Sequence, residues 1–101
     1  MKSEVKTKDD IMCVALSGDI DLEFSGEVRR VLMETIPKGR LIEVDMREVS
    51  LIDSSGVASL LEALQMARKS GKDFILLNVT DPVMRVLRLA RLDTVFTFET
   101  S

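Results

Sequence analysis

The pattern of apolar and polar residues changes its period several times along the chain, beginning with two strand-like segments. Residues 3–7 alternate weakly, as in a short edge strand, and residues 11–17 form a near-continuous apolar run typical of an inner strand. Asp9 and Asp10 stand between them and favour a turn. These segments predict a β-hairpin at the start of the chain.

Helical periodicity follows in two longer segments. Within residues 23–36, one face of a helix is formed by Phe24, Val28, Val31, Leu32 and Thr35. Pro37 and Gly39 end this helix. Residues 54–70 carry a second apolar stripe, made of Val57, Leu60, Leu61 and Leu64, and Gly71 stands where a glycine often ends a helix.

Strand patterns return after each helix. Residues 41–46 alternate, residues 74–77 form a buried apolar run, and residues 95–98 form a short closing strand. Asp81-Pro82 predicts the start of a third helix, with Asp81 as its N-cap and an apolar face of Val83, Val86, Leu87 and Ala90. The order ββαβαβαβ predicts an α/β fold, a mixed sheet of about five strands with helices packed largely on one face, because crossovers are right-handed.

Length and composition restrict what such a domain can do. The 101 residues suffice for one domain, residues 1–101, and 46% hydrophobic with 31% charged residues is globular composition. The chain has no histidine, which excludes Ser-His-Asp and Cys-His nucleophiles and histidine-bearing zinc sites. The single cysteine, Cys13, can form neither an intrachain disulfide nor a cysteine-only metal site. We therefore predict no enzyme, no catalytic residues, no metal and no cofactor.

Charge and hydropathy also bear on partners and location. The net charge of −3 argues against direct binding of nucleic acid. No apolar run approaches the roughly 20 residues that span a bilayer, and the first residues lack a signal-peptide core. The sequence predicts a soluble, cytoplasmic protein without membrane insertion, with Cys13 as a buried apolar thiol. Arg85, Arg88 and Arg91 recur on one face of the third helix, which we interpret as solvated.

Chemistry concentrates in Asp53-Ser54-Ser55-Gly56, where a strand gives way to a helix. The N–H groups of a helix start and the positive end of its dipole would favour a phosphate attached to a hydroxyl there. Gly56 has no side chain, so we expect that a partner could approach the serine closely. The residues alone favour the simpler interpretation, in which Asp53 or Ser54 is a helix cap.

The segment from Val49 to Val57, which contains this motif, resembles the signature of the STAS domain, found in bacterial anti-sigma factor antagonists. The resemblance implies that Ser54 is the phosphoacceptor and Asp53 its neighbour in the motif. Leu16-Ser17-Gly18-Asp19-Ile20-Asp21 resembles a second family stretch, whose last acid, here Asp21, lies near the phosphoacceptor loop. Asp81 to Leu87 is similar to the family's late helix. The implied partner-binding residues are Asp21, Asp53, Ser54, Ser55 and Gly56.

The function implied by this resemblance is that of a phosphorylation-switched binding module. Unphosphorylated at Ser54, it would bind an anti-sigma factor serine kinase and free a sigma factor; a serine phosphatase acting on Ser54 would restore this state. The alternative is a STAS scaffold that is never phosphorylated, a regulatory subunit of a signalling complex or of a transporter. In that case Asp53 and Ser54 would serve as helix cap and contact surface.

Overall fold

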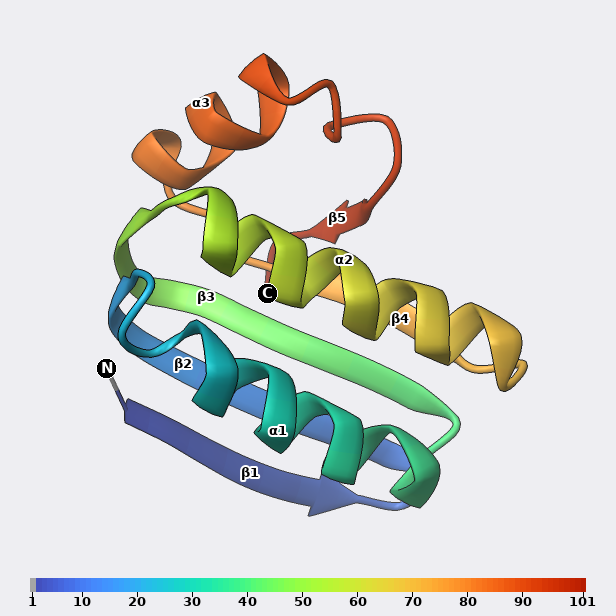
Figure 1. Cartoon of the computed structure of the whole chain (residues 1–101). Coiled ribbons are helices and arrows are strands. Elements are labelled where there is room, and N and C mark those ends of the chain that lie inside the picture. Colours follow the sequence, from blue (N-terminus) through green and yellow to red (C-terminus); the bar gives the residue numbers. More distant parts are fainter. Residues whose placement is uncertain (1) are drawn as a thin grey trace.

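The computed structural model describes residues 2–101, which fold into a single α/β domain (Figure 1). Its elements are β1 (Lys2–Lys8), β2 (Ile11–Ile20), α1 (Ser25–Thr35), the 3-10 turn η1 (Ile36–Lys38), β3 (Leu41–Ile52), α2 (Ser54–Lys69), β4 (Asp73–Leu77), α3 (Asp81–Leu89) and β5 (Thr97–Glu99). The predicted order of strands and helices is confirmed. Gly71 has a φ of +72° and follows α2, which confirms that glycine as the helix end.

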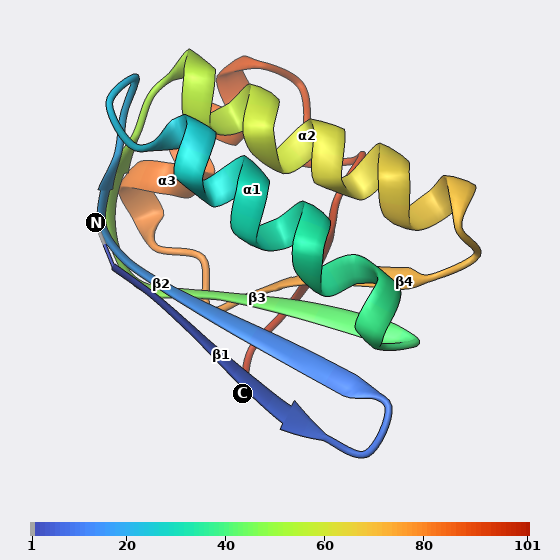
Figure 2. The ribbon, with the colours of Figure 1, turned by 60° about the horizontal axis from the view of Figure 1, so that its bottom comes forward.

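The five strands form one mixed sheet in the order β1-β2-β3-β4-β5. The hairpin strands β1 and β2 are antiparallel, and every later pair is parallel. Each parallel step moves the same way across the sheet, so right-handed crossovers place all connecting helices on the same face. Figure 2 shows the three helices on one side of the sheet, as the sequence predicted.

The hydrophobic core lies between this face and the helices. Along β2 every second side chain is buried, and these side chains point toward the helices. Helix α1 contributes the fully buried Val28 and Leu32, and α2 contributes Leu60 and Ala63. The packing of two helices on three central strands therefore fixes where α2 begins relative to the ends of β2 and β3.

Strand β3 is six residues longer than the sequence predicted, because it continues from Met46 to Ile52. Its register with β2 shifts twice, between Ala15 and Ser17 and between Gly18 and Asp19. These irregularities place Met46, Val49 and Ile52 toward the core at intervals of three residues instead of two. The broken alternation hid the strand, and its true end lies immediately before Asp53.

Two expectations about α3 and one about Cys13 were wrong. The N-cap of α3 is Thr80, not Asp81, and the Thr80 hydroxyl donates to the Val49 carbonyl (2.9 Å) instead of capping the helix. Ala90 is exposed and not part of the apolar face.

Cys13 is only half-buried, because the alternation of β2 turns it to the face opposite the helices. The last strand begins at Thr97, two residues later than predicted.

Candidate functional site

The first turn of α2 follows β3 without an intervening loop, and Asp53 is its N-cap. The backbone of Asp53 is extended (φ −106°, ψ −175°), as is usual for a capping residue. Its Oδ1 atom accepts hydrogen bonds from the Ser55 N–H (3.0 Å) and the Gly56 N–H (3.1 Å). The same oxygen accepts from the Ser55 hydroxyl (2.6 Å). One carboxylate oxygen therefore organises the whole turn.

These hydrogen bonds also set the charge of the site. The pKa of Asp53 is lowered from its ordinary value, first by the hydrogen bond from the Ser55 hydroxyl and then by the Gly56 N–H. Asp53 is therefore a carboxylate at neutral pH, adjacent to both serines. We expected the N–H groups at this helix start to favour a phosphate. For the N–H groups of Ser55 and Gly56 that expectation is wrong, because both already donate to the Asp53 carboxylate.

The two serines of the motif are in different states. The Ser55 hydroxyl is held by Asp53. The Ser54 side chain is exposed, and its hydroxyl makes no hydrogen bond to any residue between 2 and 101. A hydroxyl in this position is accessible to an incoming reactant. The structure thus distinguishes Ser54 from Ser55 on physical grounds, which the sequence alone did not.

Gly56 is buried, and its role differs from the one that we expected. A Cβ atom at this position would lie 2.7 Å from the carbonyl oxygen of Ile20 and 2.7 Å from side-chain carbons of Ile20 and Ile52. The space beside its Cα is thus filled by the ends of β2 and β3, not open to a partner. Gly56 allows the first turn of α2 to approach the sheet closely.

Asp21 lies in the neighbouring loop, between β2 and α1. Its Oδ1 atom accepts from the N–H groups of Glu23 (3.0 Å) and Phe24 (3.3 Å), which shapes the turn before α1. The Ile20 carbonyl next to it accepts from the Asp53 N–H (3.1 Å), so the end of β2 is joined to the start of α2. The structure therefore brings Asp21 and the Asp53–Gly56 turn together at the carboxyl ends of adjacent parallel strands.

A cleft of about 270 Å³ lies between these strand ends and is lined by Asp19, Ile20, Asp21, Leu51, Ile52 and Asp53. Sequence reasoning missed one exposed apolar residue that lines it, Leu51, which is 58% exposed. Leu22, in the loop that follows Asp21, is 79% exposed. Leu51 was missed because β3 was predicted to end at Met46. Leu51 belongs to the unpredicted last part of β3, where it is the cross-strand partner of Asp19. The site thus combines carboxylates with exposed leucines.

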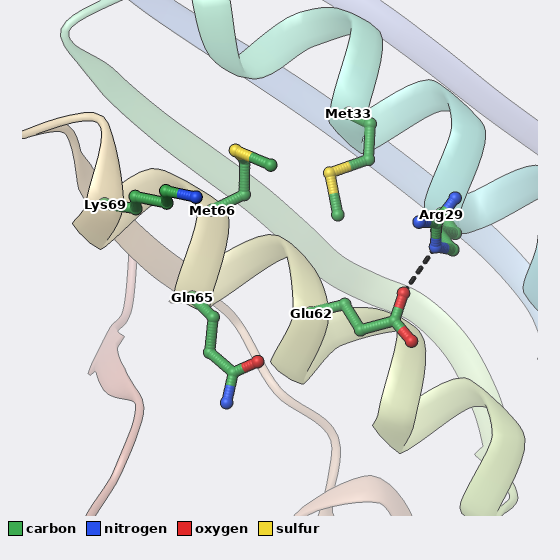
Figure 3. A pocket seen from close by; sticks show the side chains of 6 residues that line it. All are labelled: Arg29, Met33, Glu62, Gln65, Met66 and Lys69. Carbon is green, nitrogen blue, oxygen red and sulfur yellow. Dashed lines mark hydrogen bonds and ion pairs between the residues drawn. The ribbon is translucent and has the colours of Figure 1, made fainter.

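A second depression, of about 280 Å³, lies between α1 and α2 and is drawn in Figure 3. Its walls include Met33 from α1 and Met66 from α2, and an ion pair between Arg29 and Glu62 joins the two helices. None of the predicted site residues lines it. Neither depression contains a histidine, because the chain has none.

Comparisons with known proteins agree with this architecture. The family model described as the STAS domain matches residues 2–101. An anti-sigma-B factor antagonist of Listeria monocytogenes is 24% identical over 94 residues, covering 91% of this chain and 82% of that protein. MlaB of Escherichia coli, an intermembrane phospholipid transport system binding protein, is 32% identical over 79 residues, covering 78% of this chain and 79% of MlaB.

Among solved structures, the anti-sigma factor antagonist SpoIIAA of Bacillus has the same fold. Its unphosphorylated form matches with a TM-score of 0.77 at 19% identity, over 99% of this chain and 89% of SpoIIAA. Its phosphorylated form matches with a TM-score of 0.78 at 18% identity, over 99% and 91%. No helix within residues 2–101 combines the length and apolar character needed to cross a bilayer. The chain belongs to the STAS domain family.

Proposed function

We propose that this chain is an anti-sigma factor antagonist whose binding is switched by phosphorylation of Ser54. One observation carries the proposal: the Ser54 hydroxyl is exposed and without a partner in residues 2–101, whereas the Ser55 hydroxyl is bound to Asp53. Relatives that are anti-sigma factor antagonists support the choice of function. The protein is then a cytoplasmic binding module, without catalysis of its own and without direct contact to nucleic acid.

The reaction at Ser54 requires a kinase and its ATP. The Ser54 oxygen forms a bond to the γ-phosphorus of ATP, the bond to the β-phosphate oxygen breaks, ADP leaves, and the hydroxyl proton passes to a base of the kinase. The product carries about 1.5–2 additional negative charges at neutral pH. A serine phosphatase reverses this change by hydrolysis of the phosphoester.

The local electrostatics explain why such a phosphate would act as a switch. It would stand beside the Asp53 carboxylate, whose lowered pKa keeps it charged. The N–H groups of Ser55 and Gly56 are already bound to Asp53 and cannot neutralise the phosphate. Uncompensated charge next to the cleft would break an interface with the anti-sigma factor kinase. The unphosphorylated form would hold that kinase and free the sigma factor.

Phosphate transfer can be tested directly on purified proteins. The chain is incubated with ATP and the kinase encoded beside it, and intact mass is measured. We expect one added phosphate on the wild type and on Ser55→Ala, and none on Ser54→Ala. The Ser55 variant is the matched control, since both substitutions remove one hydroxyl from the same turn. Transfer that survives Ser54→Ala would refute the site.

A second candidate function is favoured by the 32% identity to MlaB, a transport-system binding protein. In this case the chain would be a regulatory subunit, and Asp53 and Ser54 would contact a partner without modification. Ser54→Ala would then keep its partner through purification, and no phosphate would appear in the intact mass of protein isolated from its own cells.

A further inference from the structure

One face of the sheet has no helix on it. Residues 2–101 place all three helices on the opposite side (Figure 2). The uncovered face presents apolar side chains that are only half-buried, namely Ile11, Cys13, Ala15, Leu41 and Ile75. Four of the five strands pair in parallel, and all-parallel sheets are almost always covered on both faces, although this sheet is mixed because β1 is antiparallel. The half-buried apolar residues leave this face able to accept an additional layer.

Charges on this face are divided between its two sides. The β1 side carries Lys2, Lys6 and Lys8, with a single acid, Glu4, among them. The side formed by β3, β4 and β5 carries Glu43, Asp45, Asp73 and Glu99, together with one cation of β3, Arg47, which lies beside Asp45. The apolar residues of β2 lie between the basic and acidic sides. When a second copy faces this surface across a two-fold axis, the basic side of each copy lies against the acidic side of the other.

The strand register gives this complementarity a definite geometry. Lys6 is the cross-strand partner of Cys13, and Cys13 is the partner of Glu43. These three residues form one row across the face with Cys13 at its centre. A two-fold axis along β2 would place Lys6 of each copy opposite Glu43 of the other, and Cys13 opposite Cys13. Such a contact is isologous, as in most homodimers.

The shape and chemistry of the row agree with this arrangement. A hollow of about 340 Å³ is lined by Lys6, Thr7, Lys8, Ile11, Cys13 and Glu43, and it could receive side chains from the second copy. Partial burial raises the pKa of Cys13, with smaller contributions from the charges of Glu43 and Asp45. Lys6 lies 3.8 Å from Glu4, but both side chains are largely exposed, so this ion pair competes weakly.

We propose that the uncovered face binds a second copy of this chain, with Lys6 paired to Glu43 across the two-fold axis. Ser54 is at the start of α2, on the helix-bearing side, and stays accessible in the dimer. Each dimer then presents two phosphorylation sites. The dimer does not depend on phosphorylation of Ser54, so the dimer proposal and the phosphorylation proposal can each fail without the other.

Charge reversal and charge exchange test this dimer. Molar mass is measured by sedimentation equilibrium over a range of concentrations for wild type, Lys6→Glu, Glu43→Lys and the double variant. Each single reversal acts twice in a two-fold dimer, and we expect it to weaken the association at least about tenfold. The double variant restores both pairs and should associate like the wild type. Lys69→Glu, in the depression of Figure 3, is the matched control and should change nothing.

Cys13 provides a second readout of the same geometry. A short bis-maleimide should link two copies of the wild type and of the double variant, but not of either single variant. Labelling with a mono-maleimide, at concentrations low enough for all four proteins to be monomeric, checks that Cys13 has the same intrinsic reactivity in each. A wild type that stays monomeric at every concentration would overturn the proposal. So would a dimer that tolerates Lys6→Glu, or a double variant that does not recover, since each would mean that this pair is not at the interface.

Discussion

The helices α2 and α3 both start after a parallel strand, but their first turns are built differently. At α2, Asp53 accepts three hydrogen bonds from its own turn. At α3, Thr80 makes no side-chain cap, and its hydroxyl donates instead to Val49 of β3. The side chain of the capping residue therefore binds its own turn at α2, whereas at α3 it binds the sheet. An internally ordered turn can hold Ser54 in place while leaving its hydroxyl free.

The largest effect should come from Gly56→Ala. The added Cβ would lie 2.7 Å from the Ile20 carbonyl oxygen, which is backbone and cannot rotate away. We expect a loss of about 1–3 kcal/mol in the free energy of unfolding, measured by urea denaturation.

The control for this variant is Gly26→Ala in the first turn of α1. No atom lies within 4 Å of a Cβ at Gly26, so this change should be neutral or should stabilise the helix by up to about 1 kcal/mol. If Gly56→Ala were as stable as Gly26→Ala, the close approach of α2 to the strand ends would be refuted.

This contrast also shows how far the sequence could predict the molecule. The order of elements, the hairpin and the apolar faces of α1 and α2 follow from local periodicity, and the structure confirms them except for Phe24, which is the N-cap before α1 and not part of its buried face. Burial of Gly56 depends on how closely α2 packs on β2 and β3, which no local pattern encodes. The same holds for Thr80, because its hydroxyl is used in a tertiary contact with Val49 instead of a cap.

Prediction of the site was limited for related reasons. The motif and the resemblance point to Ser54, but two adjacent serines have equivalent local chemistry in the sequence. Only the hydrogen bond from Ser55 to Asp53 separates them. Leu51 was not recognised as part of the cleft, because the register shifts disrupt the alternation that would have extended β3.

The next largest effect on stability should come from removing the polar side chains at the two helix starts, Asp53 of α2 and Thr80 of α3. Asp53→Ala removes an acceptor of three hydrogen bonds and should lower the melting temperature more than Thr80→Val. The Thr80 variant keeps the shape of the side chain and loses one hydrogen bond, worth about 0.5–1.5 kcal/mol. Thermal unfolding followed by circular dichroism measures both. The reverse ranking would show that attachment to the sheet matters more than internal capping.

Acid should reduce the difference between Asp53 and a neutral replacement. The pKa of Asp53 in the folded chain is below its ordinary value of 3.8, so its contribution to stability is present above that pH. The contribution is lost as the pH falls through the folded pKa. The free energy of unfolding of wild type minus that of Asp53→Asn should therefore be constant near neutral pH and decrease below about pH 4. A pH-independent difference would contradict the assigned hydrogen bonds.

The smallest effect, and the sharpest distinction, should come from the two serines. Ser55→Ala removes the largest cause of the lowered Asp53 pKa, so that pKa should rise toward its ordinary value. Ser54→Ala removes no hydrogen bond within residues 2–101 and should leave the Asp53 pKa unchanged, with stability within about 0.5 kcal/mol of the wild type. Carbon-13 NMR titration of the Asp53 carboxyl measures its pKa in both variants, and urea denaturation measures their stability. A shift caused by Ser54→Ala would mean that its hydroxyl is engaged in the turn, and the physical reason for preferring Ser54 as phosphoacceptor would be gone.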